Sequence, residues 1–303
     1  MEVLILMKGI VILGPTAVGK TSLSIKLAKK LNTEIISADS AQVYTGMDIG
    51  TAKVDLDEAQ GIFHHMIDIV EPIHKYNVGE YQRRVNTILE TFEKKEKTPI
   101  LVGGTGLYIN SITNGLAELP QSEPKLREKL HCKSSSELYE ELKVVDLCSA
   151  KDIHPNNKRR VERALEVFYL TGEKFSIIGK RNIKRNNFEF IKIGLERDRN
   201  NLYERINLRV DLMVEGGLIE EVKDLYNIYG ENLKKINVIG YSEIIDYLKE
   251  QITLEKAIFQ IKQNSRRYAK RQFTWFKNDP DVIWFDVEKI SEEEILEEIL
   301  KLI

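Results

Sequence analysis

A glycine-rich pattern directly behind an apolar run constrains the fold of this 303-residue chain more than any other feature. Residues 14–21, GPTAVGKT, match G-x-x-x-x-G-K-[ST] and follow the run IVIL at 10–13. Such a phosphate-binding loop (P-loop) leads from a strand into a helix, where backbone N–H groups and the positive end of the helix dipole face an anion. Leu23, Leu27 and Leu31 then share one stripe, so a helix follows. The pattern predicts a polyphosphate site; the alternative is a turn that only joins strand to helix.

The polar residues of the loop have separate expected roles. Lys20 would neutralise a terminal phosphate, and the Thr21 hydroxyl would be a ligand to a bound Mg²⁺. The loop alone does not choose between a substrate diphosphate and a nucleotide such as ATP. Either would contact the eight residues Gly14, Pro15, Thr16, Ala17, Val18, Gly19, Lys20 and Thr21.

Strand signals alternate with helical ones through the first third of the chain. The strand candidates at 9–13, 33–38 and 99–102 each end in a loop of small or polar residues. This alternation predicts an α/β fold, with a P-loop NTPase-like parallel sheet flanked by helices. Ligands gather at the carboxyl ends of such strands, so we expect the three loops to converge on one crevice.

The pattern changes after this first third. Only helical signals occur at 116–188, which we interpret as a helical insertion domain. A strand signal at 190–195 then returns to the sheet, and long helical patterns follow it. The predicted organisation is therefore a core in two parts, 1–115 and 189–303, interrupted by the insertion.

Charge is unevenly distributed in a chain whose net charge is only −2. The segments 151–185 and 262–277 are basic, which is typical of a localised polyanion site or, alternatively, of solvated helix faces. The acidic segment 281–300 is interpreted as plain surface. The apolar start at 3–13 is too short to span a membrane, so we interpret it as a core strand and expect no membrane association.

Neither the cysteines nor the histidines are spaced like a metal centre. Cys132 and Cys148 lack any C-x-x-C pattern, which argues against a disulfide framework and favours a reducing, cytoplasmic setting. His64, His65 and Asp68 are close in sequence, so a metal site is conceivable. Adjacent histidines do not face one way on a helix or a strand, and we therefore favour structural roles.

Two polar residues at predicted strand ends are candidates for the chemistry. Asp39 follows the strand signal at 33–38, where a carboxylate can hold Mg²⁺ through water or act as a base. The alternative is an N-cap for a following helix. Thr105 lies in the third loop, GGTGLY at 103–108, whose glycines are expected to let the backbone approach a ligand.

A run of cations marks the last long helical pattern. It comprises Lys262, Arg266, Arg267, Lys270 and Arg271. Five cations with no acid among them suit a phosphodiester backbone, so we expect this stripe to face solvent and nucleic acid. Trp275 and Phe276 are interpreted as core residues rather than as stacking platforms for bases.

Several motifs in one order resemble those of the bacterial tRNA dimethylallyltransferases over nearly the whole chain. They are the P-loop, DSAQVY at 39–44, GMDIGTAK at 46–53, HHMID at 64–68, GGTGLY at 103–108, HPNN at 154–157, Arg160, RALE at 163–166, Gly240 with Tyr241, and KRQ at 270–272. The chain departs from the family pattern around 131–136 and at Leu147, where proline is expected. These departures bear on the shape of the insertion and not on the active site.

The resemblance implies a monomeric enzyme that transfers a dimethylallyl group from dimethylallyl diphosphate to N6 of the adenine immediately 3′ of the anticodon. It implies Mg²⁺ as the cofactor and catalytic roles for Asp39, Thr105 and Lys20. The adenine must be flipped out of its loop to react. The residues expected to contact the tRNA anticodon stem-loop are Asp39, Ser40, Ala41, Gln42, Thr105, Arg127, Lys158, Arg159, Arg160, Val161, Glu162, Gly240, Tyr241, Arg267, Lys270 and Arg271.

Two other classes of protein explain parts of the sequence. A nucleotide kinase or ATPase would use the same P-loop, but it gives the basic residues at 262–271 no role. A non-catalytic RNA-binding protein leaves the convergence of Lys20, Asp39 and Thr105 unused.

Overall fold

The computed structural model describes residues 6–181, 183 and 186–303. The first residues of the predicted apolar start, 3–5, and positions 182, 184 and 185 of the first basic segment lie outside the described residues. The chain divides into two compact units. Unit 1 comprises Met1–Thr113 and Asn187–Ile303, and unit 2 comprises Asn114–Asn186.

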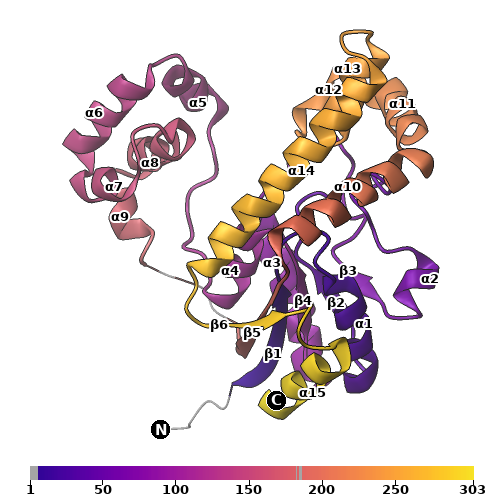
Figure 1. The fold of residues 1–303 in the computed structure, drawn as a ribbon. Helices are drawn as coiled ribbons and strands as arrows, with labels where there is room; N and C mark the ends of the chain where they lie inside the picture. The colour runs from indigo at the N-terminus through magenta and orange to yellow at the C-terminus, as the bar shows by residue number, and fades with distance from the viewer. Residues whose placement is uncertain (1–5, 182, 184–185) are drawn as a thin grey trace, which may run out of the picture. The chain divides into compact units, whose positions relative to one another are not determined.

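Unit 1 contains a six-stranded sheet in which all strands are parallel (Figure 1). The order across the sheet is β3-β2-β4-β1-β5-β6. The strands are β1 (Met7–Leu13), β2 (Ile35–Ser37), β3 (His64–His65), β4 (Ile100–Gly103), β5 (Phe188–Glu196) and β6 (Val282–Asp286). The predicted α/β fold with a parallel sheet is confirmed.

Helices follow the strands as the alternating signals predict. In unit 1 they are α1 (Lys20–Leu31), α2 (Leu56–Ala59), α3 (Val78–Lys94), α4 (Gly106–Thr113), α10 (Arg199–Glu215), α11 (Leu218–Tyr229), α12 (Glu231–Lys235), α13 (Tyr241–Leu248), α14 (Leu254–Lys277) and α15 (Glu292–Leu302). None of the helices in the described part of the chain is long and apolar enough to cross a membrane.

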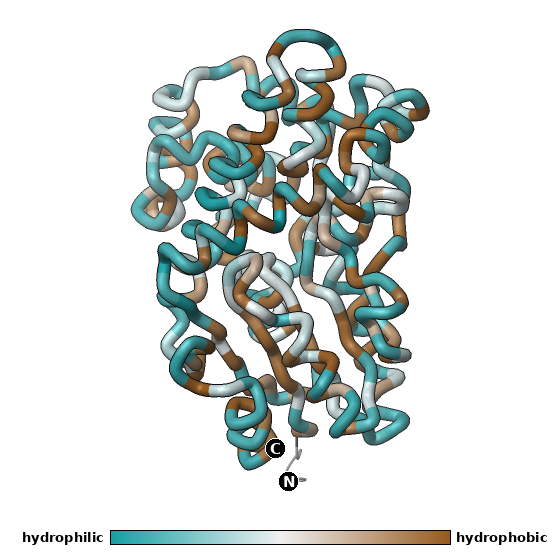
Figure 2. Tube along the Cα trace, turned by 45° about the vertical axis from the view of Figure 1, so that its right-hand side comes forward, coloured by the Kyte–Doolittle hydropathy of each residue, from teal (hydrophilic) through white to brown (hydrophobic). Residues whose placement is uncertain are grey.

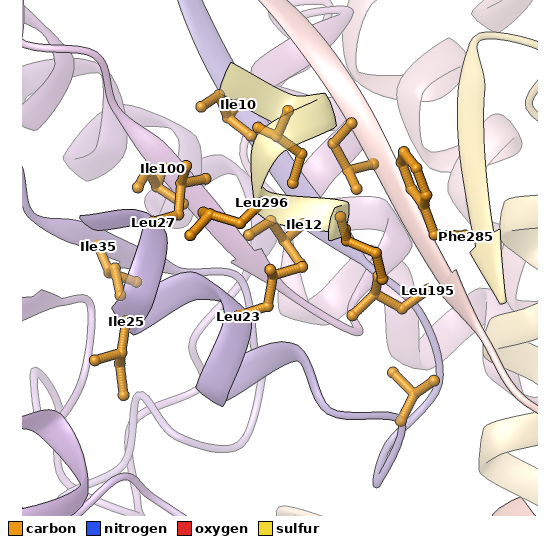
Figure 3. Packing of buried hydrophobic residues seen from close by; sticks show 14 of the residues in the cluster. Ile10, Ile12, Leu23, Ile25, Leu27, Ile35, Ile100, Leu195, Phe285 and Leu296 are labelled. Carbon is orange, nitrogen blue, oxygen red and sulfur yellow. The ribbon is translucent and has the colours of Figure 1, made fainter. Parts of the chain in front are cut away.

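The central strand β1 is buried on both faces, and the hydropathy-coloured trace is brown along the strands (Figure 2). Ile10 and Ile12 pack with residues of α1 and α15, including Leu27 and Leu296 (Figure 3). The alternate residues of β1 pack on the opposite face against α3 and α4. Because side chains of a strand alternate between faces, this continuous apolar run requires helices on both sides of the sheet.

The segment 281–300 is not plain surface, and that interpretation is wrong. It contains β6 at the edge of the sheet and α15. Ile295, Leu296 and Ile299 of α15 are buried against the sheet, while the acids occupy the outer face of the helix. The high count of acids conceals an amphipathic pattern, since the apolar residues recur at positions i, i+1 and i+4.

A third apolar cluster in unit 1 lies beyond the strand ends. It joins α11, α13 and the first half of α14 to the segment after β2, through Val43, Tyr44 and Met47. All three of those side chains are at most 8% exposed. The segment that follows Asp39 is therefore anchored on helices from the far end of the chain.

Unit 2 contains helices and, within its described residues, no strand. Its helices are α5 (Pro124–His131), α6 (Ser135–Val145), α7 (Leu147–Asp152), α8 (Lys158–Thr171) and α9 (Phe175–Ile178). They enclose their own apolar core, to which Leu130, Leu138 and Leu165 contribute. A capping box formed by Ser134 and Glu137 starts α6.

Candidate active site

The P-loop lies between β1 and α1, as predicted. Gly14 has φ of 148°, and a Cβ atom there would lie 2.7 Å from the carbonyl oxygen of Leu195 in β5. Only glycine therefore lets the loop leave β1 at this point. Gly19, with φ of 116°, precedes the first residue of α1. Residues of the loop, including Lys20 and Thr21, line a cavity of about 280 Å³.

Lys20 is directed back onto its own loop. Its Nζ donates hydrogen bonds to the carbonyl oxygens of Gly14 at 3.0 Å and Pro15 at 2.8 Å. Desolvation and the nearby Arg209 guanidinium lower the pKa of Lys20 to about 7, against the opposing effect of the Asp39 carboxylate. The loop thus holds a cation whose charge would be stabilised by an anion in the cavity.

Two arginines of α10 complete the cationic side of this cavity. Arg205 Nε donates to the carbonyl oxygen of Ala17 at 3.0 Å, and Arg209 Nη1 donates to Thr16 Oγ1 at 3.3 Å. Both side chains line the cavity, and burial lowers the pKa of Arg209. The sequence reasoning missed them, since their only signal is a spacing of four residues on a predicted helix.

Asp39 lies directly beyond the end of β2. Its Oδ1 accepts a hydrogen bond from the backbone N–H of Ala41 at 2.8 Å. No helix begins within the next sixteen described residues, because the first one, α2, starts at Leu56. Asp39 is therefore not an N-cap. Asp39 lines the same cavity as the P-loop.

The third loop lies beside Asp39. Thr105 Oγ1 accepts a hydrogen bond from the backbone N–H of Ser40 at 3.0 Å and donates to Ser40 Oγ at 3.3 Å. The carboxyl ends of β1, β2 and β4 thus carry the three predicted loops to one place. Gln42, further along the second loop, also lines the first cavity.

The glycines of the third loop allow other parts of the protein to approach its backbone closely. A Cβ on Gly103 would lie 2.2 Å from the carbonyl oxygen of Ala38, and one on Gly104 would lie 2.0 Å from Nε2 of Gln272. They therefore admit neighbouring protein atoms, and both glycines also line the first cavity. The close approach lets Gln272 Nε2 donate to the Gly104 carbonyl at 3.0 Å while its Oε1 accepts from the Thr16 N–H at 2.9 Å. Gln272 thereby ties α14 to two of the loops.

A second cavity of about 200 Å³ lies next to the first. The two cavities share wall residues, among them Thr16, Asp39, Arg209 and Tyr268. The second cavity adds Gly240 and a set of apolar side chains, namely Ile206, Val210, Met213, Val238, Ile239 and Ile261. Asp39 therefore lies at the boundary between a polar, cationic cavity and a more apolar one.

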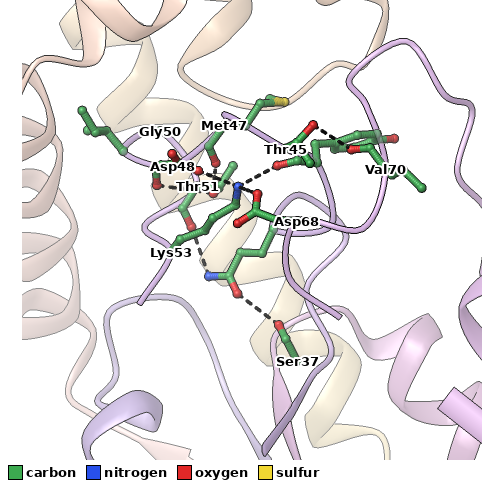
Figure 4. Close-up of polar contacts among 12 residues, drawn as sticks. Ser37, Thr45, Met47, Asp48, Gly50, Thr51, Lys53, Asp68 and Val70 are labelled. Atoms are coloured by element: carbon green, nitrogen blue, oxygen red, sulfur yellow. Dashed lines mark hydrogen bonds and ion pairs between the residues drawn. The ribbon is translucent and has the colours of Figure 1, made fainter. Parts of the chain in front are cut away.

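The segment 44–53, which supplies part of the wall between the cavities, is fixed by contacts of Lys53 and Gln42 (Figure 4). Lys53, whose side chain is only 6% exposed, contacts the carboxylates of Asp48 and Asp68 and donates to the carbonyl oxygen of Tyr44 at 2.6 Å. Gln42 donates to the carbonyl oxygens of Thr51 and Ala52 at 3.3 and 3.1 Å. The wall is thus preformed.

Glu221 of α11 holds the same segment from the other side. Its carboxylate accepts hydrogen bonds from three successive backbone N–H groups, those of Asp48 at 2.9 Å, Ile49 at 2.6 Å and Gly50 at 3.1 Å. It also accepts from the hydroxyl of Tyr241 at 2.5 Å. Tyr241 is buried, so in this structure its side chain supports the wall and does not face a partner.

Replacing Glu221 with alanine is expected to lower the free energy of unfolding by about 1–3 kcal/mol, because four donors lose their common acceptor. Urea denaturation measures the change. Glu220→Ala, which removes the adjacent exposed carboxylate, is the matched control and is expected to change stability by less than about 0.5 kcal/mol. Equal effects of the two substitutions would contradict this role of Glu221.

The two histidines of β3 have protein partners. His64 Nδ1 lies 2.9 Å from the carbonyl oxygen of Ile62, and burial lowers the pKa of His64. His65 Nε2 lies 2.7 Å from Oε2 of Glu34. His64 also lines the first cavity, which was not expected. Among the residues described, no three histidine, cysteine or acidic side chains are grouped as a metal cluster.

The cations of α14 do not form the uniform solvent-facing stripe that was predicted. Lys262 pairs with Asp211 of α10 at 2.6 Å, and Arg266 donates to Asn207 of α10 at 2.5 Å. These two cations are used in packing α10 on α14. The exposed members of the set are Arg267, Lys270 and Arg271.

The two aromatic residues near the end of α14 differ from each other. Phe276 is 2% exposed, which confirms its interpretation as a core residue. Trp275 is 48% exposed, so the same interpretation is wrong for that residue. The reason is helical geometry, because neighbouring positions on a helix point about 100° apart and only one of the two can face the sheet.

The remaining predicted contact residues belong to unit 2. The side chain of Arg127 is 56% exposed, with Nε 3.2 Å from the buried carboxylate of Glu166. The others lie in the first turns of α8. Arg159 and Arg160 are exposed, Val161 is buried, and Lys158 and Glu162 are partly buried. Within the α8 set, Arg159 and Arg160 therefore present the most accessible charge.

The chain is similar to known proteins over most of its length. Residues 42–279 match the family model described as IPP transferase. A tRNA dimethylallyltransferase of Fusobacterium nucleatum is 58% identical over 298 residues, covering 98% of each chain. One from Anoxybacillus flavithermus is 49% identical over 92% of this chain and 90% of its own.

Solved structures are similar as well. A tRNA isopentenylpyrophosphate transferase from Bacillus halodurans has a TM-score of 0.73 at 42% identity, covering 97% of this chain and 95% of its own. A eukaryotic dimethylallyltransferase described as acting on tRNA has a TM-score of 0.81 at 32% identity, covering 92% of this chain and 74% of its own.

Proposed function

Because this chain belongs to the tRNA dimethylallyltransferase family, we propose that it moves a dimethylallyl group from dimethylallyl diphosphate to N6 of the adenine immediately 3′ of the anticodon. The observation that carries the proposal is the position of Asp39, between a cationic cavity and a more apolar one. Diphosphate belongs in the first cavity and the acceptor base in the second. The Asp39 carboxylate then lies where the two substrates meet.

The acceptor amine needs a base. The lone pair of an adenine N6 is delocalised into the ring, which makes it a poor nucleophile. Asp39, within hydrogen-bond reach, would orient the amine and accept its proton as the N–C bond forms. Thr105, which lines neither cavity, holds the neighbouring loop in place through the Ser40 N–H, and Ser40 lines the second cavity. Ala41, bound to Asp39 through its N–H, fixes the carboxylate orientation.

The leaving group needs positive charge. As the bond between the allyl carbon and oxygen breaks, negative charge grows on the departing diphosphate. Residues of the P-loop, including Lys20, line the cavity that would hold it, as do Arg205 and Arg209. Fixed donors that meet developing charge stabilise the transition state more than the ground state. For this reaction a diphosphate is a more suitable ligand of the loop than a nucleoside triphosphate, because the reaction transfers no phosphoryl group.

We also propose Mg²⁺ as the cofactor, and the donor set fits it. Protein sites for Mg²⁺ used with phosphates contribute only one or two ligands and leave the rest to phosphate oxygens and water. Thr21 lines the first cavity, so its hydroxyl would supply one such ligand and Asp39 would stay free to act as the base. When bound, the ion would neutralise charge on the diphosphate.

The proposal is tested with labelled dimethylallyl diphosphate and unmodified tRNA. Label is expected in the tRNA, with one diphosphate released for each group transferred. ATP hydrolysis without transfer would indicate a nucleotide-dependent enzyme built on the same loop.

We further propose that one chain forms the whole site, so the enzyme acts as a monomer in the cytoplasm. Both cysteines are free, as suits that compartment. Sedimentation with and without tRNA tests the monomer.

Neutralising Lys270 and Arg271 together by glutamine is expected to weaken tRNA binding and to lower the slope of log affinity against log salt by about 1.5. The reason is the loss of two phosphate contacts, each of which releases counterions. Filter binding across a range of salt concentrations measures the slope. Lys256→Gln, an exposed cation on the first turn of α14, is the control and should leave the slope unchanged. An unchanged slope in the double variant would remove these residues from the RNA interface.

A further inference from the structure

We propose that Trp275 is a stacking platform for an unpaired nucleobase of the substrate RNA, next to the adenine that reacts. The inference rests on the proposed function for the identity of the partner. Its structural basis is the position and exposure of the indole ring, and the charge around it.

The indole packs against the backbone of Gly106. A Cβ on Gly106 would lie 2.3 Å from both Cδ1 and Nε1 of Trp275 and 2.8 Å from Cε2. A point nearly equidistant from three atoms of the five-membered ring lies over the face of that ring. Gly106 backbone therefore packs against the ring face, which fixes the side chain, while 48% of the residue remains exposed. Any larger residue at position 106 would displace the indole.

The ring is next to the candidate active site. Gly106 follows Thr105, whose Oγ1 accepts the hydrogen bond from the N–H of Ser40, and Asp39 precedes Ser40. On α14, Gln272 lies one turn before Trp275 and binds the Gly104 carbonyl oxygen, while Tyr268, one further turn back, lines both cavities. The face of α14 that closes the cavities thus continues directly to the exposed indole.

The surroundings of the ring suit RNA better than a protein partner. Arg267, Lys270 and Arg271 are exposed on the same half of α14, and within the described residues none of them has a carboxylate partner. Arg271 lies over the Tyr268 ring, with its guanidinium carbon 5.6 Å from the centroid. A flat aromatic face on the half of the helix that carries these exposed cations matches a base with its phosphates. A base flipped out of an RNA loop leaves unstacked neighbours that such a face can receive.

Tryptophan fluorescence gives a direct test, because the chain has only two tryptophans. In the Trp284→Phe variant the emission excited at 295 nm comes from Trp275 alone. Titration with an anticodon stem-loop RNA is expected to quench that emission, with the same midpoint as binding measured by anisotropy. One loop nucleotide made abasic, on either side of the reactive adenine, should abolish most of the quenching. Unchanged emission at saturating RNA, or quenching indifferent to every abasic position, would overturn the proposal.

Substitution supplies the second test. Trp275→Ala is expected to weaken stem-loop binding by about 5- to 150-fold, the range for loss of one base–aromatic stack, and Trp275→Phe is expected to recover most of it. Phe259→Ala removes an even more exposed ring (59%, against 48% for Trp275) from the first half of α14 and should leave binding unchanged. Equal binding by the wild type and Trp275→Ala would overturn the platform. Failure of prenyl transfer alongside intact quenching would instead overturn the proposed function and leave the platform standing.

Discussion

Asp39→Asn is expected to lower kcat by at least about 10²-fold while leaving the affinity for tRNA nearly unchanged. The asparagine keeps an Oδ1 acceptor for the Ala41 N–H, the contact that orders the residue in the wild type. It cannot accept the proton of the adenine amine, and loss of a general base has effects of about 10² to 10⁴. Single-turnover transfer rates and separate stem-loop binding measure the two quantities.

Asp39→Ala separates chemistry from local order. It removes both the base and the contact with Ala41, so its kcat should fall at least as far, and its KM for tRNA should also rise. An Asp39→Asn enzyme with near-normal kcat and weakened tRNA binding would make Asp39 a docking residue. That result would contradict the mechanism, although the fold would be unaffected.

Lys20→Met is expected to lower kcat/KM for dimethylallyl diphosphate by about 10²- to 10³-fold, the effect of removing one preorganised donor from developing charge. The methionine keeps the length and the apolar stem of the side chain. Lys30→Met, an exposed cation on the last turn of α1, is the matched control and should leave transfer unchanged. Comparable losses in the two variants would show a general charge effect rather than a specific one.

The same lysine predicts a pH signature. Its pKa is lowered to about 7 in the ligand-free protein, so above pH 7 most molecules hold it neutral. A bound diphosphate favours the charged form and raises that pKa, so binding must take up a proton and affinity must fall as pH rises above about 7. Calorimetry in two buffers of different ionisation enthalpy measures the uptake. Lys20→Met should lack it; an uptake that persists in this variant would assign it elsewhere.

The central fold was predictable because its signals are local. The apolar run at 10–13, the P-loop and the stripe of α1 lie within about twenty residues, and they specify a strand, a loop and a helix without reference to the rest of the chain. β6 was missed for the opposite reason. Its apolar residues lie among acids, and they become a strand only because β5 offers an unpaired edge. Burial by a distant partner overrides local composition.

The residues of the site differ in the same way: some have a local sequence signal and others do not. Lys20, Thr21, Asp39 and Thr105 follow directly from strand ends, and the topology of a parallel sheet brings them together. Arg205, Arg209 and Glu221 could not be assigned, since each acts on a loop more than 150 residues away. Their sequence context is that of ordinary amphipathic helices. The sequence did not distinguish the exposed half of α14 from its packed half. That distinction depends on two contacts with α10, in which Lys262 pairs with Asp211 and Arg266 donates to Asn207.

The most direct test of the account is the position of the transferred group. Unmodified tRNA incubated with the enzyme and dimethylallyl diphosphate is cut with a nuclease, and each fragment is weighed by mass spectrometry. We expect a single dimethylallyl increment, on the adenine immediately 3′ of the anticodon, and no increment with Asp39→Asn over the same time. An unmodified anticodon loop in the presence of active, tRNA-bound enzyme, or an increment at another nucleotide, would contradict it.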